Sequence, residues 1–294
     1  MKRALLRPLL LLALLCAGPA SAQAKVSLVL GLYPSEKPRN MVEALRPSLN
    51  AIEDMMESWL GEEVEIRIQM LSDYVSALNA LVAGEVDFAR IGPASYVMGK
   101  KEQPGLELLA MENSHGGVTF QGMIVVRDDS DLRTVTDLKG RSFAFVSERS
   151  TLGRYFPQAY LAEAGISARD LGGYAYVGHH EAVGLAVWAG RFDAGAMNGR
   201  MYEKLVDRGV RLRAIASFEN VTRPWVARAG LPVETAEGLR QALLSLDDPE
   251  ILEALGFDGF LPAVDNYYEP TRRLIAEHVE DYSQYTPKDT SSLQ

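Results

Sequence analysis

The sequence contains almost no cysteine and little histidine. Cys16 is the only cysteine among 294 residues, and there are four histidines. Cys16 lies in an N-terminal segment that we expect to be removed, so the mature chain would have neither a disulfide nor thiol chemistry. Without disulfides, stability must come from a hydrophobic core. Apolar residues make up 47% of the chain, which is enough for one large domain or two lobes.

Long apolar runs are absent after the N-terminus. Three basic residues precede an apolar run over residues 9–17, and Ala20-Ser21-Ala22 has the small residues of a cleavage site. We therefore predict a secretory signal peptide over residues 1–22, with Gln23 as the first mature residue. A membrane anchor is disfavoured because a spanning helix needs about 20 apolar residues.

Lipid attachment at Cys16 is a further, less favoured interpretation of this segment. The residue before a lipidated cysteine is usually small, whereas Leu15 is bulky. Cleavage after Ala22 and release as a soluble exported protein is the preferred interpretation.

Positive charge is also scarce. The net charge of the full chain is −9, and the signal segment carries three basic residues and no acids. The mature chain therefore has 27 basic and 39 acidic residues, a net charge of −12. This balance argues against nucleic acid or an anionic membrane as a partner. It does not argue against a small anion, which backbone N–H groups and helix dipoles can hold locally.

Strand-like and helix-like segments alternate through most of the mature chain. Apolar spacing predicts strands over 26–32 and 64–70, with a helix over 40–60 between them. Such alternation indicates an α/β fold in which mainly parallel sheets carry helices on both faces. In such folds, ligands bind at the carboxyl ends of strands.

Two lobes fit this alternation. We expect the first lobe to comprise residues 23–118 and 224–282, and the second lobe to comprise residues 119–223. The polar residues 283–294 should form a flexible tail. A ligand would then bind in the cleft between the lobes.

The segment from Ser150 to Gly153 has the features of an anion site. It follows a predicted strand and opens a predicted helix that extends to Ala164. Ser150 and Thr151 offer hydroxyls, the first helical turn offers free N–H groups, and Gly153 would let a ligand approach the backbone. A plain Ser/Thr helix cap without a ligand is equally open on this segment alone, because such caps are common.

Two other helix starts add polar groups. His179 and His180 open a predicted helix, and either one could donate a hydrogen bond to an anion. Adjacent histidines point in different directions and no third ligand is suitably spaced, so a zinc site is disfavoured. Ser95 follows the Gly92-Pro93 turn, and Tyr74 on an earlier loop could supply a phenol.

Taken together, these segments resemble the phosphate/phosphite/phosphonate-binding periplasmic proteins of ABC importers over nearly the whole mature chain. The shared pattern is a Gly-x-Val-Asp strand running into a Gly turn, a Ser/Thr loop ending at a proline, a Gly-x-His-Glu-Ala helix start and a Gly-x-x-Asp-Ala strand. These motifs stand here at residues 84–93, 150–157, 178–182 and 190–194. The resemblance implies a type II periplasmic binding fold and a small phosphorus oxyanion as ligand.

The resemblance also implies roles for particular residues. Ser150 and Thr151 match hydroxyls that bind the phosphorus oxygens, and His180, not His179, matches an anion-binding histidine. Tyr74 matches a tyrosine that packs on the ligand and hydrogen-bonds to it. We include Gly153 and Ser95 as further ligand-binding candidates.

Four positions depart from the pattern of the family. Leu152 and Phe120 replace a serine and a tyrosine, so two hydroxyls are lost. Arg200 and Arg223 stand where aminophosphonate binders have carboxylates for the ligand's ammonium. Arginines there would repel an ammonium and favour a second anionic group, or close over the oxyanion itself. A surface salt bridge for each arginine is an equally open interpretation.

Three functions are compatible with these features. The first is a periplasmic receptor that delivers its ligand to an ABC permease, acting as a monomer without cofactor or metal. The second keeps the fold but presents the closed form to a signalling receptor in the inner membrane. The third, an exported hydrolase, is disfavoured because Gly-x-Ser-x-Gly and His-Glu-x-x-His motifs are absent.

Overall fold

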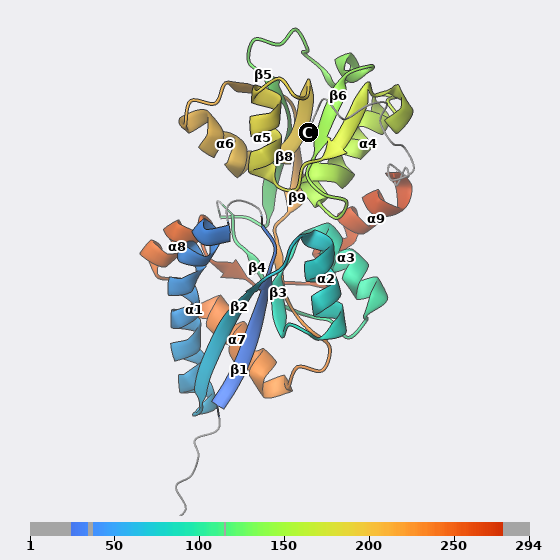
Figure 1. Cartoon of the computed structure of the whole chain (residues 1–294). Helices are drawn as coiled ribbons and strands as arrows, with labels where there is room; N and C mark the ends of the chain where they lie inside the picture. The colour runs from blue at the N-terminus through green and yellow to red at the C-terminus, as the bar shows by residue number, and fades with distance from the viewer. Residues whose placement is uncertain (1–24, 35–37, 115, 279–294) are drawn as a thin grey trace, which may run out of the picture.

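The computed structural model describes residues 25–34, 38–114 and 116–278. The expected signal peptide, Cys16 and the expected tail at 283–294 lie outside these residues. Figure 1 shows two lobes, one above the other, each built around one sheet with helices on both sides. No helix among the described residues is long and apolar enough to cross a membrane.

The first lobe contains a six-stranded sheet in the order β11-β4-β10-β3-β1-β2. Helices α1 and α7 pack together, whereas α2 and α3 pack together elsewhere in the lobe (Figure 1). The strands are β1 (Lys25–Leu32), β2 (Glu63–Met70), β3 (Phe88–Arg90), β4 (Glu107–Glu112), β10 (Pro224–Ala227) and β11 (Phe260–Leu261). The helices are α1 (Pro38–Leu60), α2 (Tyr74–Ala83), α3 (Pro93–Glu102), α7 (Val233–Ser245) and α8 (Pro249–Leu255).

The second lobe contains a five-stranded sheet in the order β7-β6-β8-β5-β9. Its strands are β5 (Thr119–Arg127), β6 (Ser142–Phe145), β7 (Gly173–Tyr176), β8 (Ala194–Asn198) and β9 (Leu212–Val221). Its helices are α4 (Phe156–Glu163), α5 (His180–Trp188) and α6 (Gly199–Asp207). Three short helical segments complete it: η1 (Val135–Leu138), η2 (Thr151–Tyr155) and η3 (Ala168–Asp170).

Each sheet has parallel strand pairs on one side and antiparallel pairs on the other, so the mainly parallel sheets that we expected are mixed. In the first sheet β1 pairs in parallel with β2 and β3, while β10 runs antiparallel between β3 and β4. In the second sheet β6 pairs in parallel with β7 and β8, while β5 runs antiparallel to β8 and β9. The expected two-lobed α/β fold is therefore present, with mixed sheets.

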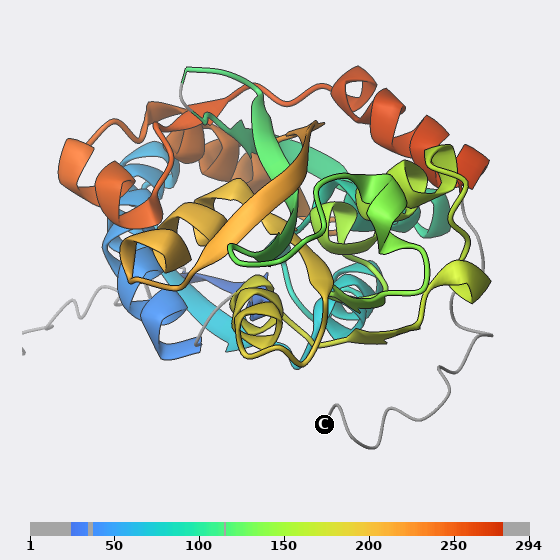
Figure 2. The same cartoon turned by 90° about the horizontal axis from the view of Figure 1, so that it is seen from above.

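The chain passes between the lobes before β5 and again after β9. It then returns through β10 into the centre of the first sheet, where Trp225 is fully buried. The C-terminal segment, η4 (Asp265–Tyr268) followed by α9 (Glu269–His278), lies at the side of both lobes (Figure 2). Helix α9 contacts α3 of the first lobe and η2 and α4 of the second. Its Thr271 Oγ1 lies 3.2 Å from Asn220 Oδ1 on β9.

Candidate functional site

Four helical segments begin at the junction of the two lobes. Helices α2 and α3 come from the first lobe, and η2 and α5 come from the second. The polar side chains at these starts are all buried: Tyr74, Ser95, Ser150, Thr151 and His180. Because helix N-termini present unpaired N–H groups and positive dipole ends, their convergence suits an anion.

The Ser150-Thr151 segment makes contact with both lobes. Ser150 Oγ accepts a hydrogen bond of 3.0 Å from the N–H of Gly153, as a helix cap does. Thr151 Oγ1 accepts a 2.9 Å bond from the N–H of Ala94, at the start of α3 in the first lobe. Beside it, Ser95 Oγ lies 3.5 Å from the carbonyl of Arg149. The lobes are therefore closed on each other at the predicted anion loop.

The helix expected from Ser150 begins with a π-type turn rather than an α turn. Tyr155 N–H donates to the carbonyl of Ser150, five residues earlier, over 3.2 Å. Regular α-helix starts only at Phe156. Turns of this kind are rare and occur often at functional sites.

Gly153 is needed for packing within the second lobe. A Cβ atom there would lie 2.3 Å from Val146 Cγ2 and 2.7 Å from Ser150 Oγ. The absence of a side chain therefore lets η2 pack on the strand end at Val146. A role of Gly153 in ligand binding stays a prediction.

The two histidines at the start of α5 have separate tasks. His179 caps the helix, since its Nδ1 accepts a 3.2 Å hydrogen bond from Ala182 N–H. His180 is buried, and its Nδ1 accepts a 3.2 Å hydrogen bond from Asn198 N–H. An Nδ1 that accepts leaves the proton of the neutral ring on Nε2, which is then a donor. Burial, followed by the nearby charge of Arg223, lowers the pKa of His180 to about 3.

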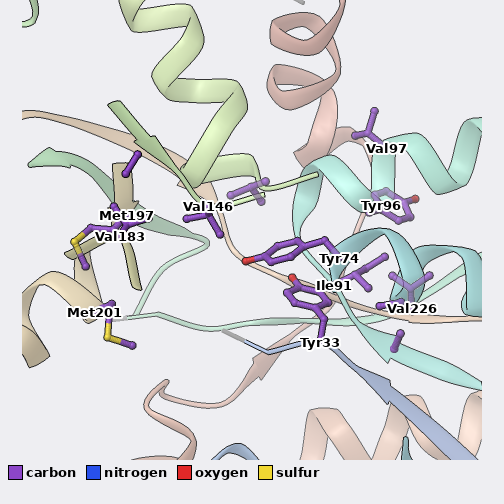
Figure 3. Close-up of a cluster of buried hydrophobic side chains, with 14 of the residues drawn as sticks. Tyr33, Tyr74, Ile91, Tyr96, Val97, Val146, Val183, Met197, Met201 and Val226 are labelled. Carbon is purple, nitrogen blue, oxygen red and sulfur yellow. The ribbon is translucent and has the colours of Figure 1, made fainter. Parts of the chain in front are cut away.

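Two tyrosines of the first lobe lie against this junction. The rings of Tyr33 and Tyr74 have centroids 3.8 Å apart, and Figure 3 shows their hydroxyls on the side toward Val146. The Tyr74 phenol interacts with the Ser150 side chain, and Tyr33 interacts with Arg223. Burial raises the pKa of both phenols, so they stay protonated and can donate.

Tyr33 was missed by the sequence interpretation. It directly follows β1, at the carboxyl end of a parallel strand, which is where ligands of such folds bind. This position at the end of a strand is the sequence feature that could have identified Tyr33 as a site residue.

A buried group of charges borders the same junction. Glu112 pairs with Arg90 over 2.5 Å and with Arg223 over 3.8 Å. Burial alone would raise the pKa of Glu112, but the charges of Arg90 and Arg223 hold it below its ordinary value. Two arginines around one carboxylate leave a net positive charge. Neither Arg90 nor Glu112 was a sequence candidate.

Arg223 is largely buried, and its guanidinium carbon lies 5.3 Å from the centroid of the Phe120 ring. The surface salt bridge considered for Arg223 is therefore wrong.

Arg200 lies further along the cleft. It donates a 2.7 Å hydrogen bond to the carbonyl of Leu255, at the end of α8 in the opposite lobe. Arg200 thus links the two lobes in the closed form.

A cavity of about 700 Å³ adjoins this group of residues. Arg90, Glu112, Phe120, Arg200 and Arg223 all lie in its walls, which come from both lobes. No three His, Cys, Asp or Glu side chains of the described residues are placed to hold a metal ion.

Comparison with known proteins gives concordant results. The family of ABC transporter phosphonate periplasmic substrate-binding proteins matches residues 30–268. A probable ABC transporter phosphite-binding protein, PhnD1 of Prochlorococcus marinus (strain MIT 9301), is 27% identical over 229 residues, covering 70% of this chain and 76% of the relative. The phosphate-import protein PhnD of Mycolicibacterium smegmatis is 30% identical over 219 residues, covering 68% of this chain and 65% of that protein.

A solved structure of PhnD1 from Prochlorococcus marinus (MIT 9301) in complex with methylphosphonate shares the fold. The TM-score is 0.73 at 22% identity, and the match covers 85% of this chain and 97% of the other. The type II periplasmic binding fold expected from the sequence is thereby confirmed.

Proposed function

Because the chain belongs to the periplasmic substrate-binding proteins of phosphonate ABC transporters, we propose that it binds a small phosphorus oxyanion where the starts of α2, α3, η2 and α5 converge. Its family consists of transport proteins that bind substrates, not enzymes, so the exported hydrolase is set aside. The ligand would be a phosphonate, phosphite or phosphate.

The observation that carries this proposal is the preset orientation of His180. Its Nδ1 is occupied by Asn198 N–H, so the ring offers Nε2–H from a buried position. The phenols of Tyr33 and Tyr74, the hydroxyls of Ser150 and Thr151, and Arg223 lie around the same junction. Uncharged donors and one excess positive charge suit a tetrahedral oxyanion.

Thr151 suggests how binding and closure are coupled. In the closed form its hydroxyl already contacts Ala94 N–H of the other lobe. A ligand that bridges these helix starts would favour closure, because it binds the closed form better than the open form. Arg200 would contribute through its bond to Leu255 rather than as a direct ligand.

Removal of the Ser150 hydroxyl tests the anion loop. We expect Ser150→Ala to weaken binding of the preferred oxyanion by about 1.5–3 kcal/mol, the range for a hydrogen bond to a charged group. Thr151→Ala should have an effect of the same size. Calorimetry with phosphate, phosphite and methylphosphonate measures both, with Ser58→Ala on the exposed face of α1 as a matched control. Unchanged affinity in both loop variants would refute the assignment.

The charges near the junction predict discrimination against ammonium groups. Arg223 occupies a site where a carboxylate would be needed to pair with an ammonium, so 2-aminoethylphosphonate should bind more weakly than methylphosphonate. Titration of both compounds under one set of conditions decides this. Tighter binding of the amino compound would contradict the charge argument.

Family membership implies an ABC permease as the membrane partner, and we propose import as the role of this chain. A signalling receptor that reads the closed form is the alternative, because Leu152 and Phe120 remove two family hydroxyls. Permease and ATPase genes beside the coding gene would support import, whereas a receptor gene would support sensing. We further propose that the exported protein is a monomer cleaved after Ala22. N-terminal sequencing checks the cleavage site, and light scattering checks the oligomeric state.

A further inference from the structure

The cavity beside the proposed anion site is much larger than one tetrahedral ion requires. Its volume of about 700 Å³ lies within the range of about 300–1,000 Å³ that is typical of sites for organic ligands. Arg223 belongs to both regions: it lines the cavity, and it interacts with Tyr33 at the anion junction. A ligand whose oxyanion lies at the junction could therefore extend a substituent into the cavity.

The walls of the cavity suit a substituent of mixed polarity. Apolar side chains from both lobes line it: Met41, Leu45, Phe120, Met201 and Phe257. Gln121 and Asn198 add amide groups between them. Burial of a ligand's carbon atoms here would be favourable in free energy, and ligand hydroxyls could hydrogen-bond to these amide groups.

Charged side chains of both signs line the cavity. Four are cationic and three are anionic: Arg90, Arg200, Lys204 and Arg223, and Glu112, Glu203 and Glu219. The one excess positive charge is accounted for by the oxyanion. The remaining wall therefore favours neutral polar groups on the substituent rather than a second strong charge.

We propose that the ligand is an organic phosphonate or phosphate monoester with a hydroxyl-bearing substituent of two or more carbons, held in this cavity. The proposal rests on the proposed oxyanion site and adds the class of the ligand. Inorganic phosphate, phosphite and methylphosphonate would fill the anion site and leave the cavity empty of ligand.

Calorimetry with four probes tests the ligand class. Glycerol 3-phosphate or 2-hydroxyethylphosphonate should bind at least tenfold more tightly than inorganic phosphate and methylphosphonate. If both organic probes bind no more tightly than the two small ions, the inference is overturned and the oxyanion site stands. If no probe binds at all, the proposed function itself fails.

A cavity-filling variant tests the location. Ala254 is an exposed residue of α8 that lines the cavity, so Ala254→Trp can place a ring there without disturbing the core. It should lower the ratio of organic-probe to phosphate affinity at least fivefold. The matched control Ala162→Trp, exposed on α4 and away from the cavity, should keep the wild-type ratio. A ratio that stays the same in both variants would overturn the placement in this cavity.

Discussion

Glu112→Gln should lower the free energy of unfolding by about 3–5 kcal/mol, the cost of removing one partner from a buried ion pair. Glu112 is 4% exposed and is the carboxylate that pairs with both Arg90 and Arg223. Glutamine keeps the shape but removes the negative charge that Glu112 places beside the two largely buried guanidinium groups. Urea denaturation of the wild type and the variant measures the difference.

The same variant links stability to ligand binding. A phosphorus oxyanion would supply the negative charge that the variant has lost, so saturating phosphate should restore more stability to Glu112→Gln than to the wild type. Binding at a hundredfold excess over Kd contributes about 2.7 kcal/mol in either protein. If phosphate raises the free energy of unfolding more in the variant than in the wild type, the difference measures how far the bound anion compensates the positive charge of the two arginines.

Glu107→Gln is the matched control, because Glu107 pairs with Arg240 at an exposed position of the same strand. An exposed pair contributes about 0–1 kcal/mol, so this variant should remain close to the wild type. Equal losses in the two variants would show that Glu112 is not the counter-ion of the buried arginines.

Much of the fold could be predicted because its determinants are local. The apolar spacing over residues 40–60 predicts a helix, and α1 spans Pro38–Leu60. Asp73 and Gly84, which are residue types typical of helix caps, bound α2. Asp73 Oδ1 accepts a 2.8 Å hydrogen bond from Ser76 N–H, and Gly84 has the positive φ of 76° that favours glycine.

Short strands far from their partners could not be predicted in this way. The sequence after Phe218 has mainly helical patterns, yet β10 and β11 add strands to the first sheet. β10 has four residues and pairs with β3 and β4, which lie more than a hundred residues earlier. Its place in the sheet comes from pairing and from the burial of Trp225, not from a local pattern.

The same difference applies to the candidate site: some of its residues lie in local motifs, whereas others are brought together only by the fold. Ser150, Thr151 and His180 stand at helix starts, and helix starts have recognisable sequences. Arg90 and Glu112 end two strands that are not neighbours, and β10 brings Arg223 beside them. The bond between Thr151 and Ala94 depends on closure of the lobes, which one lobe's sequence cannot encode alone.

His180 should make the protein less stable as the pH falls. Its pKa is about 3 in the folded state, chiefly because of burial, and about 6.5 in an unfolded chain. Between these values the unfolded chain binds one more proton, so the stability is fully present above pH 6.5 and is lost toward pH 3. At 1.36 kcal/mol for each unit, the loss reaches about 2 kcal/mol at pH 5.

The variant His180→Gln isolates this contribution from that of the carboxylates. Glutamine does not titrate, and it offers both an acceptor for Asn198 N–H and a donor toward the junction. Urea denaturation at pH 7.5 and pH 5 should show that the wild type loses about 2 kcal/mol more than the variant over this interval. Parallel losses would mean that His180 is protonated in the folded protein. The ring would then carry a charge toward the oxyanion, and its role as a neutral Nε2–H donor would have to be abandoned.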